Sequence, residues 1–445
     1  KRVGDLILLM GVLEVYPFTQ TWDFRELAAW SQTAVVDPAW VAALGIGLLA
    51  GPMSKCAQFP LHLWLDEAME GPLPSTILRN AVVVATGAWI LVKLEPVLAL
   101  SPTVLTVTIA IGAITSLGGS LISVAQIDLK RVLSYLSSTY MGLVFVAVGT
   151  QHPGAALLLA LTYALSMGVL VMGAGSIIIN VVTQDLTQMG GLWSRRPVTG
   201  VAILVGAFGL VAVPPLGGFW AMLRLVTELW LDGQVLIVGL VLAVNWITAF
   251  SLARVFGLIF AGEPQQMTVR APEPIWFIVL PMVVGAGFTL HLPLILEALH
   301  LLPNWAAMNT DMALVLTWAS TFGFGIGALL FVGRRFKNPA EVVPAKIRDL
   351  LAFDFYTPRL YRSSVVLGVD LLSRLTDWLD RYLVDGIVNA VGLASLVGGE
   401  TLKYNNSGRL QFYVLTISIG VVLIGILMSW RYLPDLMMTI SMNFG

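Results

Sequence analysis

Residues 51–74 read Gly-Pro-Met-Ser-Lys-Cys-Ala-Gln-Phe-Pro-Leu-His-Leu-Trp-Leu-Asp-Glu-Ala-Met-Glu-Gly-Pro-Leu-Pro. A lysine, a glutamine, a histidine and three carboxylates lie there within an otherwise apolar sequence, and four prolines and two glycines interrupt the stretch. A charged side chain at the centre of a membrane helix costs about 2.5–3.5 kcal/mol. Proline removes a backbone donor, and the freed backbone groups must find protein or water partners. The stretch predicts a broken membrane helix with polar residues at the break.

The rest of the chain is typical of a membrane protein. Of its 445 residues, 57% are hydrophobic and 11% are charged, whereas a soluble domain has about 25% charged residues. The short alternating segments of a membrane barrel do not occur in the sequence. Apolar runs recur that are each long enough to cross a bilayer as a helix: 74–92, 103–125, 155–182, 198–219, 235–261, 275–300, 312–333 and 410–430. The predicted fold is an all-α polytopic membrane protein, a helix bundle with roughly ten or eleven spans.

The composition also excludes several classes of function. The net charge of −1 gives nucleic-acid binding no electrostatic support. The single cysteine, Cys56, rules out an internal disulfide, and one cysteine with four histidines is too sparse for a zinc cluster. No glycine-rich phosphate loop follows a strand pattern, so we expect no metal or cofactor in this chain. The chain starts with Lys1 and is apolar from residue 6, so we expect that an N-terminal part of the natural protein precedes it.

A second interruption lies at Val213-Pro-Pro-Leu-Gly-Gly-Phe219. Two interrupted spans far apart in the sequence are typical of a transport site near the middle of the membrane. The basic pairs Lys130-Arg131 and Arg195-Arg196 are separated by two predicted spans, so they lie on one side of the membrane. The positive-inside rule makes that side cytoplasmic. A third basic cluster lies at 334–337.

The composition changes after this cluster. In 361–403, charged residues recur at roughly helical spacing amid Leu, Val and Trp, which predicts a long amphipathic helix along the membrane or against neighbouring helices. A polar turn and the final span 410–430 follow. We therefore expect a transmembrane bundle over 1–335, a connection with the lateral helix over 336–409, and a C-terminal helix with its tail over 410–445.

The first break contains the strongest candidates for proton chemistry. Lys55, Gln58 and His62 are spaced i, i+3 and i+7, so they share one helical face if Pro60 only bends the helix. A desolvated lysine can accept and release a proton near neutral pH. The alternative is a lysine that extends its ammonium to the membrane interface.

Three further cations are candidates close to this break. Arginine does not deprotonate in proteins, so Arg79 can bias a proton path without relaying protons along it; alternatively, it pairs with Glu70 or Asp66. Lys130 and Arg131 open a helix whose hydroxyl-rich residues 134–140 could hold a water chain. The alternative for both is a charged cytoplasmic turn.

The second half of the bundle contains three more candidates. Arg224 and Glu228 are spaced i, i+4 just after the second break, and we expect them to form a structural ion pair. Arg254 is an isolated charge in the predicted span 235–261 and is either functional or structural. Each remaining histidine lies beside a proline or a helix end, and we interpret all three as loop residues: His152, His291 and His300.

Four motifs together resemble the antiporter-like subunits of complex I. The motifs are Lys55-Cys-Ala-Gln-Phe-Pro-Leu-His-Leu-Trp64 with Ala68-Met-Glu-Gly-Pro72, Ala125-Gln-Ile-Asp-Leu-Lys-Arg-Val-Leu-Ser-Tyr135, Gly173-Ala-Gly-Ser176 with Asp185-Leu186 and Met189-Gly-Gly-Leu192, and Pro214-Pro-Leu-Gly-Gly-Phe-Trp220. The lateral helix before a final span is similar to subunit 5, the NdhF or NuoL type, and Val384-Asp-Gly-Ile-Val-Asn389 with Gln411-Phe-Tyr413 resembles the NdhF branch. The similarity covers nearly the whole chain. It places five helices of the family before it, including one with a glutamate partner for the lysine.

The resemblance implies roles for two lysines and identifies several departures. Lys55 would be the lysine of the first broken helix, and Lys130 a member of the central proton path. At several positions this chain differs from the residue that the family often has. The family often has His where this chain has Asn80, His and Lys where it has Tyr163 and Met167, Lys where it has Met222, and Pro where it has Asp66. Because methionine cannot carry a proton, the usual relay is depleted. Either water with Tyr163, Ser166 or Arg224 replaces it, or this variant handles protons differently.

The departures are most similar to the specialised NdhF variants of cyanobacterial complexes that take up carbon dioxide. The resemblance implies a thylakoid membrane-arm subunit of a photosynthetic complex I, which takes part in proton translocation while other subunits transfer electrons to plastoquinone. The implied partners are NdhD- and NdhB-like subunits, lipids and a peripheral carbonic-anhydrase-like protein. Two alternatives stay open: the large subunit of a multi-subunit sodium/proton antiporter, and a structural anchor that docks a carbon-dioxide-hydrating protein.

Overall fold

The computed structural model describes residues 1–302, 308–332, 344–405 and 408–430, which form helices and no strand. In this part of the chain nine helices are long and apolar enough to span a membrane, or ten when the bent pair Arg2–Thr19 and Phe24–Thr33 counts as one span. The prediction of an all-α polytopic membrane protein is confirmed. The basic cluster 334–337 and the tail 431–445 lie outside the described residues.

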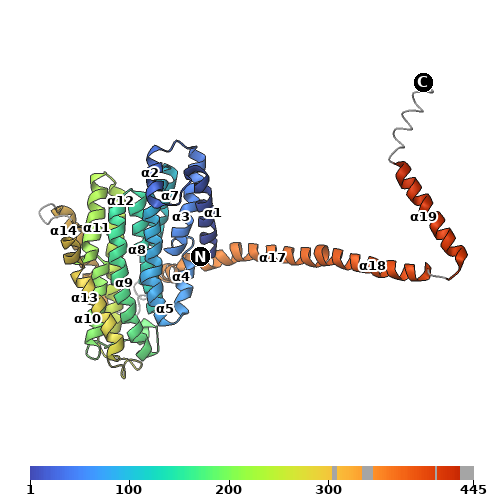
Figure 1. Cartoon of the computed structure of the whole chain (residues 1–445). Helices are drawn as coiled ribbons and strands as arrows, with labels where there is room; N and C mark the ends of the chain where they lie inside the picture. The colour runs from blue at the N-terminus through green and yellow to red at the C-terminus, as the bar shows by residue number, and fades with distance from the viewer. Residues whose placement is uncertain (303–307, 333–343, 406–407, 431–445) are drawn as a thin grey trace. The chain divides into compact units, whose positions relative to one another are not determined.

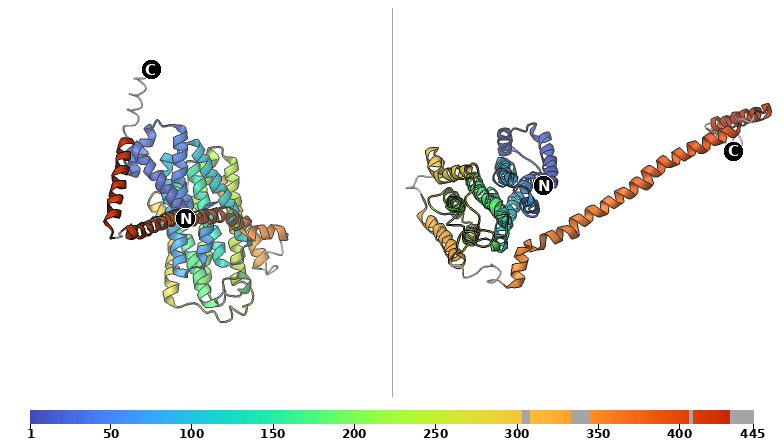
Figure 2. Two further views of the ribbon diagram at one scale, coloured as in Figure 1. Left: turned by 90° about the vertical axis from the view of Figure 1, so that its right-hand side faces the viewer. Right: turned by 90° about the horizontal axis from the view of Figure 1, so that it is seen from below.

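The chain divides into two compact units, Lys1–Pro358 and Arg359–Gly445. The first unit is a bundle whose helices run mostly along one direction (Figure 1). Its helices are α1 (Arg2–Thr19), α2 (Phe24–Thr33), α3 (Pro38–Lys55), α4 (Leu63–Glu67), α5 (Leu73–Leu78), α6 (Val84–Leu98), α7 (Pro102–Ala125), α8 (Leu129–Gly149), α9 (Pro153–Val181), α10 (Pro197–Leu210), α11 (Gly217–Leu231), α12 (Val235–Phe260), α13 (Trp276–Ala298), α14 (Thr310–Phe331) and α15 (Ala345–Ala352). In Figure 2 the early helices α1 and α3 form one flank of the bundle, and α13 and α14 lie on the other.

The second unit contains the predicted amphipathic helix. The chain is helical from Thr357 to Asn405 through α16 (Thr357–Tyr361), α17 (Leu367–Leu379) and α18 (Asp385–Asn405), with one π-helical turn between each pair. Ion pairs at i, i+4 spacing support this helix: Arg374–Asp370 at 2.9 Å and Arg381–Asp377 at 3.1 Å. The final helix α19 (Leu410–Trp430) matches the predicted last span.

Helix α8 is the core of the bundle. All of its residues except Arg131 are buried, and it packs against α6, α7 and α9. A Cβ atom added to Gly112 on α7 would lie 2.5 Å from the carbonyl oxygen of Gly142 on α8, and one added to Gly142 would lie 2.7 Å from the carbonyl oxygen of Gly112. Small residues permit such close backbone approach between membrane helices, where burial from water does not drive association.

Both predicted breaks are present. Between α3 and α5 the chain forms only α4 and a single 3-10 turn, Ala68–Glu70. Between α10 and α11 a backbone group freed by the break finds a neighbour, because Asn245 on α12 accepts a hydrogen bond of 3.0 Å from the buried Ala212 amide. Freed backbone groups at membrane depth thus find protein partners, as they must.

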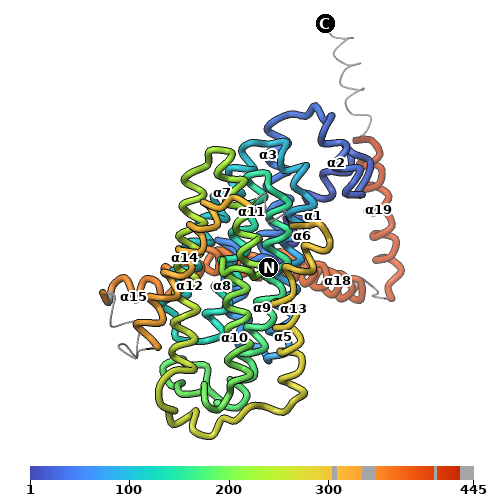
Figure 3. Tube along the Cα trace, turned by 90° about the vertical axis from the view of Figure 1, so that its left-hand side faces the viewer, coloured from blue at the N-terminus to red at the C-terminus, as the bar shows by residue number. Residues whose placement is uncertain are grey.

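The connections before α8 and after α9 lie at the same end of the bundle. The segment before α8 pairs with the segment after α9, since the Leu129 amide donates to Gln184 O at 2.9 Å and the Leu186 amide donates to Ile127 O at 2.8 Å. This pairing places Lys130-Arg131 and Arg195-Arg196 at one end, as predicted. Figure 3 shows α2 at one end of the bundle and the connection after α12 at the other.

Candidate functional site

Lys55 has an acidic partner within the described chain. Its Nζ lies 2.8 Å from Oδ1 of Asp5 on α1, and both side chains are partly exposed. The two helices approach closely: a Cβ added to Gly4 would lie 2.8 Å from Oγ of Ser54, and one added to Gly51 would lie 2.9 Å from Cβ of Leu8. An ammonium and a carboxylate therefore meet at the point where α3 ends, on the flank of the bundle.

Beyond Lys55 the chain turns sharply, and the predicted common face does not exist. Ala57 has φ +50°, and α3 ends before it. The Gln58 side chain points into the bundle and donates to the Ser138 carbonyl of α8 at 3.1 Å. The Phe59 amide donates to Thr115 Oγ1 of α7 at 3.0 Å. The prediction that Lys55, Gln58 and His62 share a helical face is wrong, because Pro60 lies in a non-helical turn rather than in a bend.

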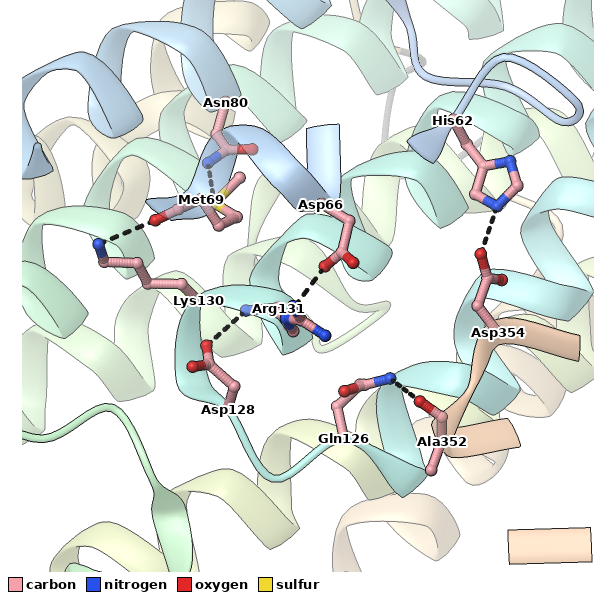
Figure 4. A network of polar contacts seen from close by, with 10 residues as sticks. All are labelled: His62, Asp66, Met69, Asn80, Gln126, Asp128, Lys130, Arg131, Ala352 and Asp354. Atoms are coloured by element: carbon pink, nitrogen blue, oxygen red, sulfur yellow. Dashed lines mark hydrogen bonds and ion pairs between the residues drawn. The ribbon is translucent and has the colours of Figure 1, made fainter. Parts of the chain in front are cut away.

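His62 instead joins the break to a segment near the end of the first unit. Its Nε2 lies 2.7 Å from Oδ2 of Asp354, and both side chains are buried (Figure 4). Nearby, Gln126 Nε2 donates to the Ala352 carbonyl at 3.1 Å. These contacts fix residues 352–354 against α7 and the first break.

Lys130 holds the second half of the same break. Its Nζ donates to the carbonyl oxygens of Met69 at 3.0 Å and Gly71 at 3.3 Å (Figure 4). Arg131 is the outward residue of the helix start, with Nε 3.6 Å from Oδ1 of Asp66. Asp128 caps the helix by accepting from the Arg131 amide at 3.0 Å.

Arg79 contacts the same region but has a different partner from the one predicted. Its guanidinium donates to the Ala68 carbonyl and, at 3.2 Å, to Ser75 Oγ. Neither Glu70 nor Asp66 forms an ion pair with it among the described residues. The arginine caps the short turn that ends the break, so its charge neutralises backbone dipoles rather than a carboxylate.

Uncharged polar side chains lie between α8, α9 and the π-helical turn Arg79–Val83 that precedes α6. Ser137 donates to Asn80 Oδ1 at 3.2 Å, and Tyr163 donates to the Asn80 carbonyl at 2.6 Å. Tyr140 and Thr162 oxygens are 3.2 Å apart. All five side chains are buried. They form a set of hydroxyl and amide groups in the core, at the height where the resemblance leads one to expect histidine and lysine.

Arg254 is buried completely on α12. Its Nη2 donates to the carbonyls of Ser123 at 2.9 Å and Gln126 at 2.8 Å, which are among the last of α7. Within the described residues, its Nε and Nη1 have no hydrogen-bond partner. The geometry is that of a side chain capping a helix C-terminus, where a cation is favourable.

The second half of the bundle contains a separate charged group. Arg224 Nε lies 2.9 Å from Glu228 Oε1, so the predicted ion pair is confirmed. His152, just before α9, faces Glu228 and Asp232, which the loop interpretation did not foresee. His300 follows α13, as predicted, whereas His291 lies inside α13 and is exposed, so its assignment to a loop is wrong.

No group of three or more His, Cys, Asp or Glu side chains is placed to hold a metal ion among the residues described above. The groups at these sites are ion pairs of lysine, arginine and histidine with carboxylates, cations that cap backbone carbonyls, and internal hydroxyl and amide groups. This set can exchange, hold and orient protons.

The sequence relatives agree with this description. A model of the family described as NADH:quinone oxidoreductase/Mrp antiporter, TM, matches residues 1–248. NAD(P)H-quinone oxidoreductase subunit 5, organellar chromatophore 2, of Paulinella chromatophora is 41% identical over 97% of this chain and 69% of that protein. NAD(P)H-quinone oxidoreductase chain 5 of Picosynechococcus sp. is 30% identical over 95% of this chain and 71% of that protein.

A solved structure shows the same fold. A chain of the Mrp complex from Dietzia sp. matches with a TM-score of 0.59 over 74% of this chain and 68% of that chain, at 20% identity. At this identity the likeness concerns the fold, while the sequence relatives decide the family. The chain belongs to the subunit 5 family of NAD(P)H-quinone oxidoreductases, the antiporter-like subunits of the membrane arm of a proton-translocating complex.

Proposed function

We propose that this chain conducts protons through the membrane arm while other subunits transfer electrons to plastoquinone in the thylakoid membrane. The observation that carries the proposal is the Lys55–Asp5 ion pair, 2.8 Å long, at the end of a broken helix. A lysine that alternates between an acidic partner and water can load a proton onto a path. The break beside it supplies backbone groups that are not engaged in helical hydrogen bonds.

The remaining groups divide into a path and its supports. Asn80, Ser137 and Tyr163 are buried next to the break and bonded to one another, so they can orient a chain of water molecules. Lys130 and Arg254 donate to backbone carbonyls at the ends of helical segments, so they position those segments. In this arrangement hydroxyl groups and water take the place of the histidine and lysine that often form the proton path in the family.

We further propose that the complex is the form that takes up carbon dioxide. The support is the set of departures at Asn80, Tyr163, Met167 and Met222, all of them buried in the bundle. The partners in this proposal are NdhD- and NdhB-like membrane subunits and a peripheral carbonic-anhydrase-like protein. Proton removal from carbon dioxide hydration would then be coupled to redox-driven translocation.

The two alternatives have less support. The sodium/proton antiporter reading rests on a fold likeness at 20% identity, while the relatives at 41% and 30% identity are both subunits of a quinone oxidoreductase. If the chain were a structural anchor that transports no protons, the Lys55–Asp5 pair would have no role in the membrane. Water molecules linking Lys55 with the region of Asn80 would argue against the anchor.

The proton proposal is tested with the purified complex in proteoliposomes. Lys55→Ala and Asp5→Asn should each lower proton uptake per electron while electron transfer to plastoquinone persists. Lys93→Ala is the matched control, since Lys93 is an exposed lysine on α6. Unchanged pumping in both variants would reject the role of the pair.

The carbon dioxide proposal has its own test. Inactivating the gene for this chain in its host should lower the rate of carbon dioxide uptake, measured by mass spectrometry of dissolved gas, while bicarbonate uptake continues. Loss of respiratory or cyclic electron flow with normal carbon dioxide uptake would show that the complex is not the form that takes up carbon dioxide.

A further inference from the structure

We propose that His152, Glu228 and Asp232 form a proton-release site at the end of the bundle opposite Lys130. The inference rests on the proposed function and deepens it by naming where protons leave the chain. Helix α8 has 21 residues, which at 1.5 Å each is about 31 Å, or one bilayer core. Lys130 lies at its start and His152 just after its end, so the two residues flank opposite faces of the membrane.

The three side chains converge from two helices. His152 is the N-cap residue of α9, while Glu228 and Asp232 are spaced i, i+4 at the end of α11. Nδ1 of His152 lies 3.5 Å from Oε2 of Glu228, and its Nε2 lies 3.1 Å from Oδ2 of Asp232. Both contacts are within ion-pair distance but are not hydrogen bonds, since Nε2 of His152 and Oε2 of Glu228 have no hydrogen-bond partner among the described residues.

One additional proton would balance the charges of this group. A neutral imidazole has no net charge, whereas an imidazolium at these distances is attracted by both carboxylates. Arg224, 2.9 Å from Glu228, supplies the remaining positive charge. With His152 protonated, two cations balance two carboxylates. Without that proton the group has a net negative charge and attracts the next proton.

The three side chains become more exposed to solvent from the interior outward. Side-chain exposure increases from 14% for His152 through 29% for Glu228 to 47% for Asp232. Arg224 and Glu228 line a cavity of about 390 Å³ together with Trp220, Thr227 and His300. A partly buried histidine next to a more exposed carboxylate and a cavity is the order of groups that proton release to bulk water needs.

The position explains one departure from the resemblance. The lysine that the family often has on this helix is replaced by Met222, which is buried. The ionisable groups of α11 begin at Arg224, nearer the membrane surface. In the release step the imidazolium gives its Nε2 proton to Asp232, and the carboxylic acid gives it to water; a proton from the interior then restores the imidazolium.

The test measures proton release by the purified complex in proteoliposomes, with a pH dye on the release side and plastoquinone reduction followed in parallel. We expect His152→Gln and Glu228→Gln to lose most proton release per electron, and Asp232→Asn to lose the dependence of release on the pH of that side. His291→Gln is the matched control, because that histidine is exposed on α13. If His152→Gln complexes do not assemble, Asp232→Asn still tests the proposal, since Asp232 is the most exposed of the three.

The outcomes separate this proposal from the proposed function. Wild-type release and pH dependence in His152→Gln and Asp232→Asn, together with impaired release in Lys55→Ala, would overturn the release site alone. Impaired release in His152→Gln with normal release in Lys55→Ala would support the site and reject the entry at Lys55. Normal release in all variants would reject both.

Discussion

Nε2 of His62 and Oδ2 of Asp354 lie 2.7 Å apart, although 292 positions separate the two residues. The histidine follows the turn that ends α3, and the aspartate precedes α16 by three residues. Both side chains are buried, so the loss of either one leaves a polar partner in the interior. The pair ties the first broken helix to the segment from which the second unit begins.

Asp354→Ala should destabilise the protein by about 3 kcal/mol, because it leaves His62 buried without its partner. The matched change is Asp370→Ala, which removes an exposed ion pair with Arg374 and should cost about 0–1 kcal/mol. Thermal unfolding of the purified complex, followed by dye binding to Cys56 as it becomes exposed, measures both. Equal midpoints for the two variants would contradict a structural role for the His62 pair.

Lys130→Met should loosen the first break. The change removes both hydrogen bonds to Met69 and Gly71, and charged donors contribute about 1.5–3 kcal/mol each. Hydrogen exchange of peptides covering 63–72 should become faster, while peptides of α12 stay unchanged. Lys93→Met is the comparison, since that lysine is exposed on α6. Similar exchange in both variants would show that Lys130 does not hold the break.

Gly112→Ala should destabilise the bundle by about 1–3 kcal/mol, because the added methyl group would meet the Gly142 carbonyl at 2.5 Å. Gly239→Ala on α12 is the control, as a Cβ there meets no described atom within 4 Å. Alanine is the better helix former, so this control should be neutral or stabilising by up to about 1 kcal/mol. Thermal midpoints that fall equally in both variants would contradict close packing of α7 on α8.

Tyr163→Phe should lower proton translocation without loss of the fold. The change removes the hydroxyl that donates to Asn80 O at 2.6 Å, while the ring keeps its stacking on Tyr140 at 5.7 Å. The expected stability loss is about 1 kcal/mol. Met167→Leu is the volume-matched control in the same helix. Proton uptake that is the same in both variants would exclude the Tyr163 hydroxyl from the path.

Features within one or two helical turns could be predicted from the sequence. The breaks at 51–74 and 213–219 follow from proline and glycine in long apolar runs, and the Arg224–Glu228 pair follows from i, i+4 spacing. Predictions failed where the outcome depended on the path of the chain after a break. Pro60 did not bend a helix but lies in a turn, and this sent Gln58 and His62 to different partners.

The partners of the charged residues were the hardest features to foresee. Asp5 and Lys55 are 50 positions apart, and His152 meets Glu228 only because α9 and α11 pack together. The helical spacing rules, such as i, i+4, cannot predict pairs between residues so far apart in the sequence. Arg254 showed the same limit, since its backbone acceptors at the end of α7 have no signature in the sequence.

The sequence by itself determined the class of the protein, its membrane spans, both breaks and the family motifs, because hydrophobic length and backbone-breaking residues act locally. Only the tertiary structure decided that Lys55 pairs with Asp5, that His62 pairs with Asp354, and that Lys130 and Arg254 cap backbone carbonyls. The physical reason is that a buried charge must find whatever counter-charge or carbonyl the packed helices bring within reach. The partner of each buried charge therefore depends on how the whole bundle packs.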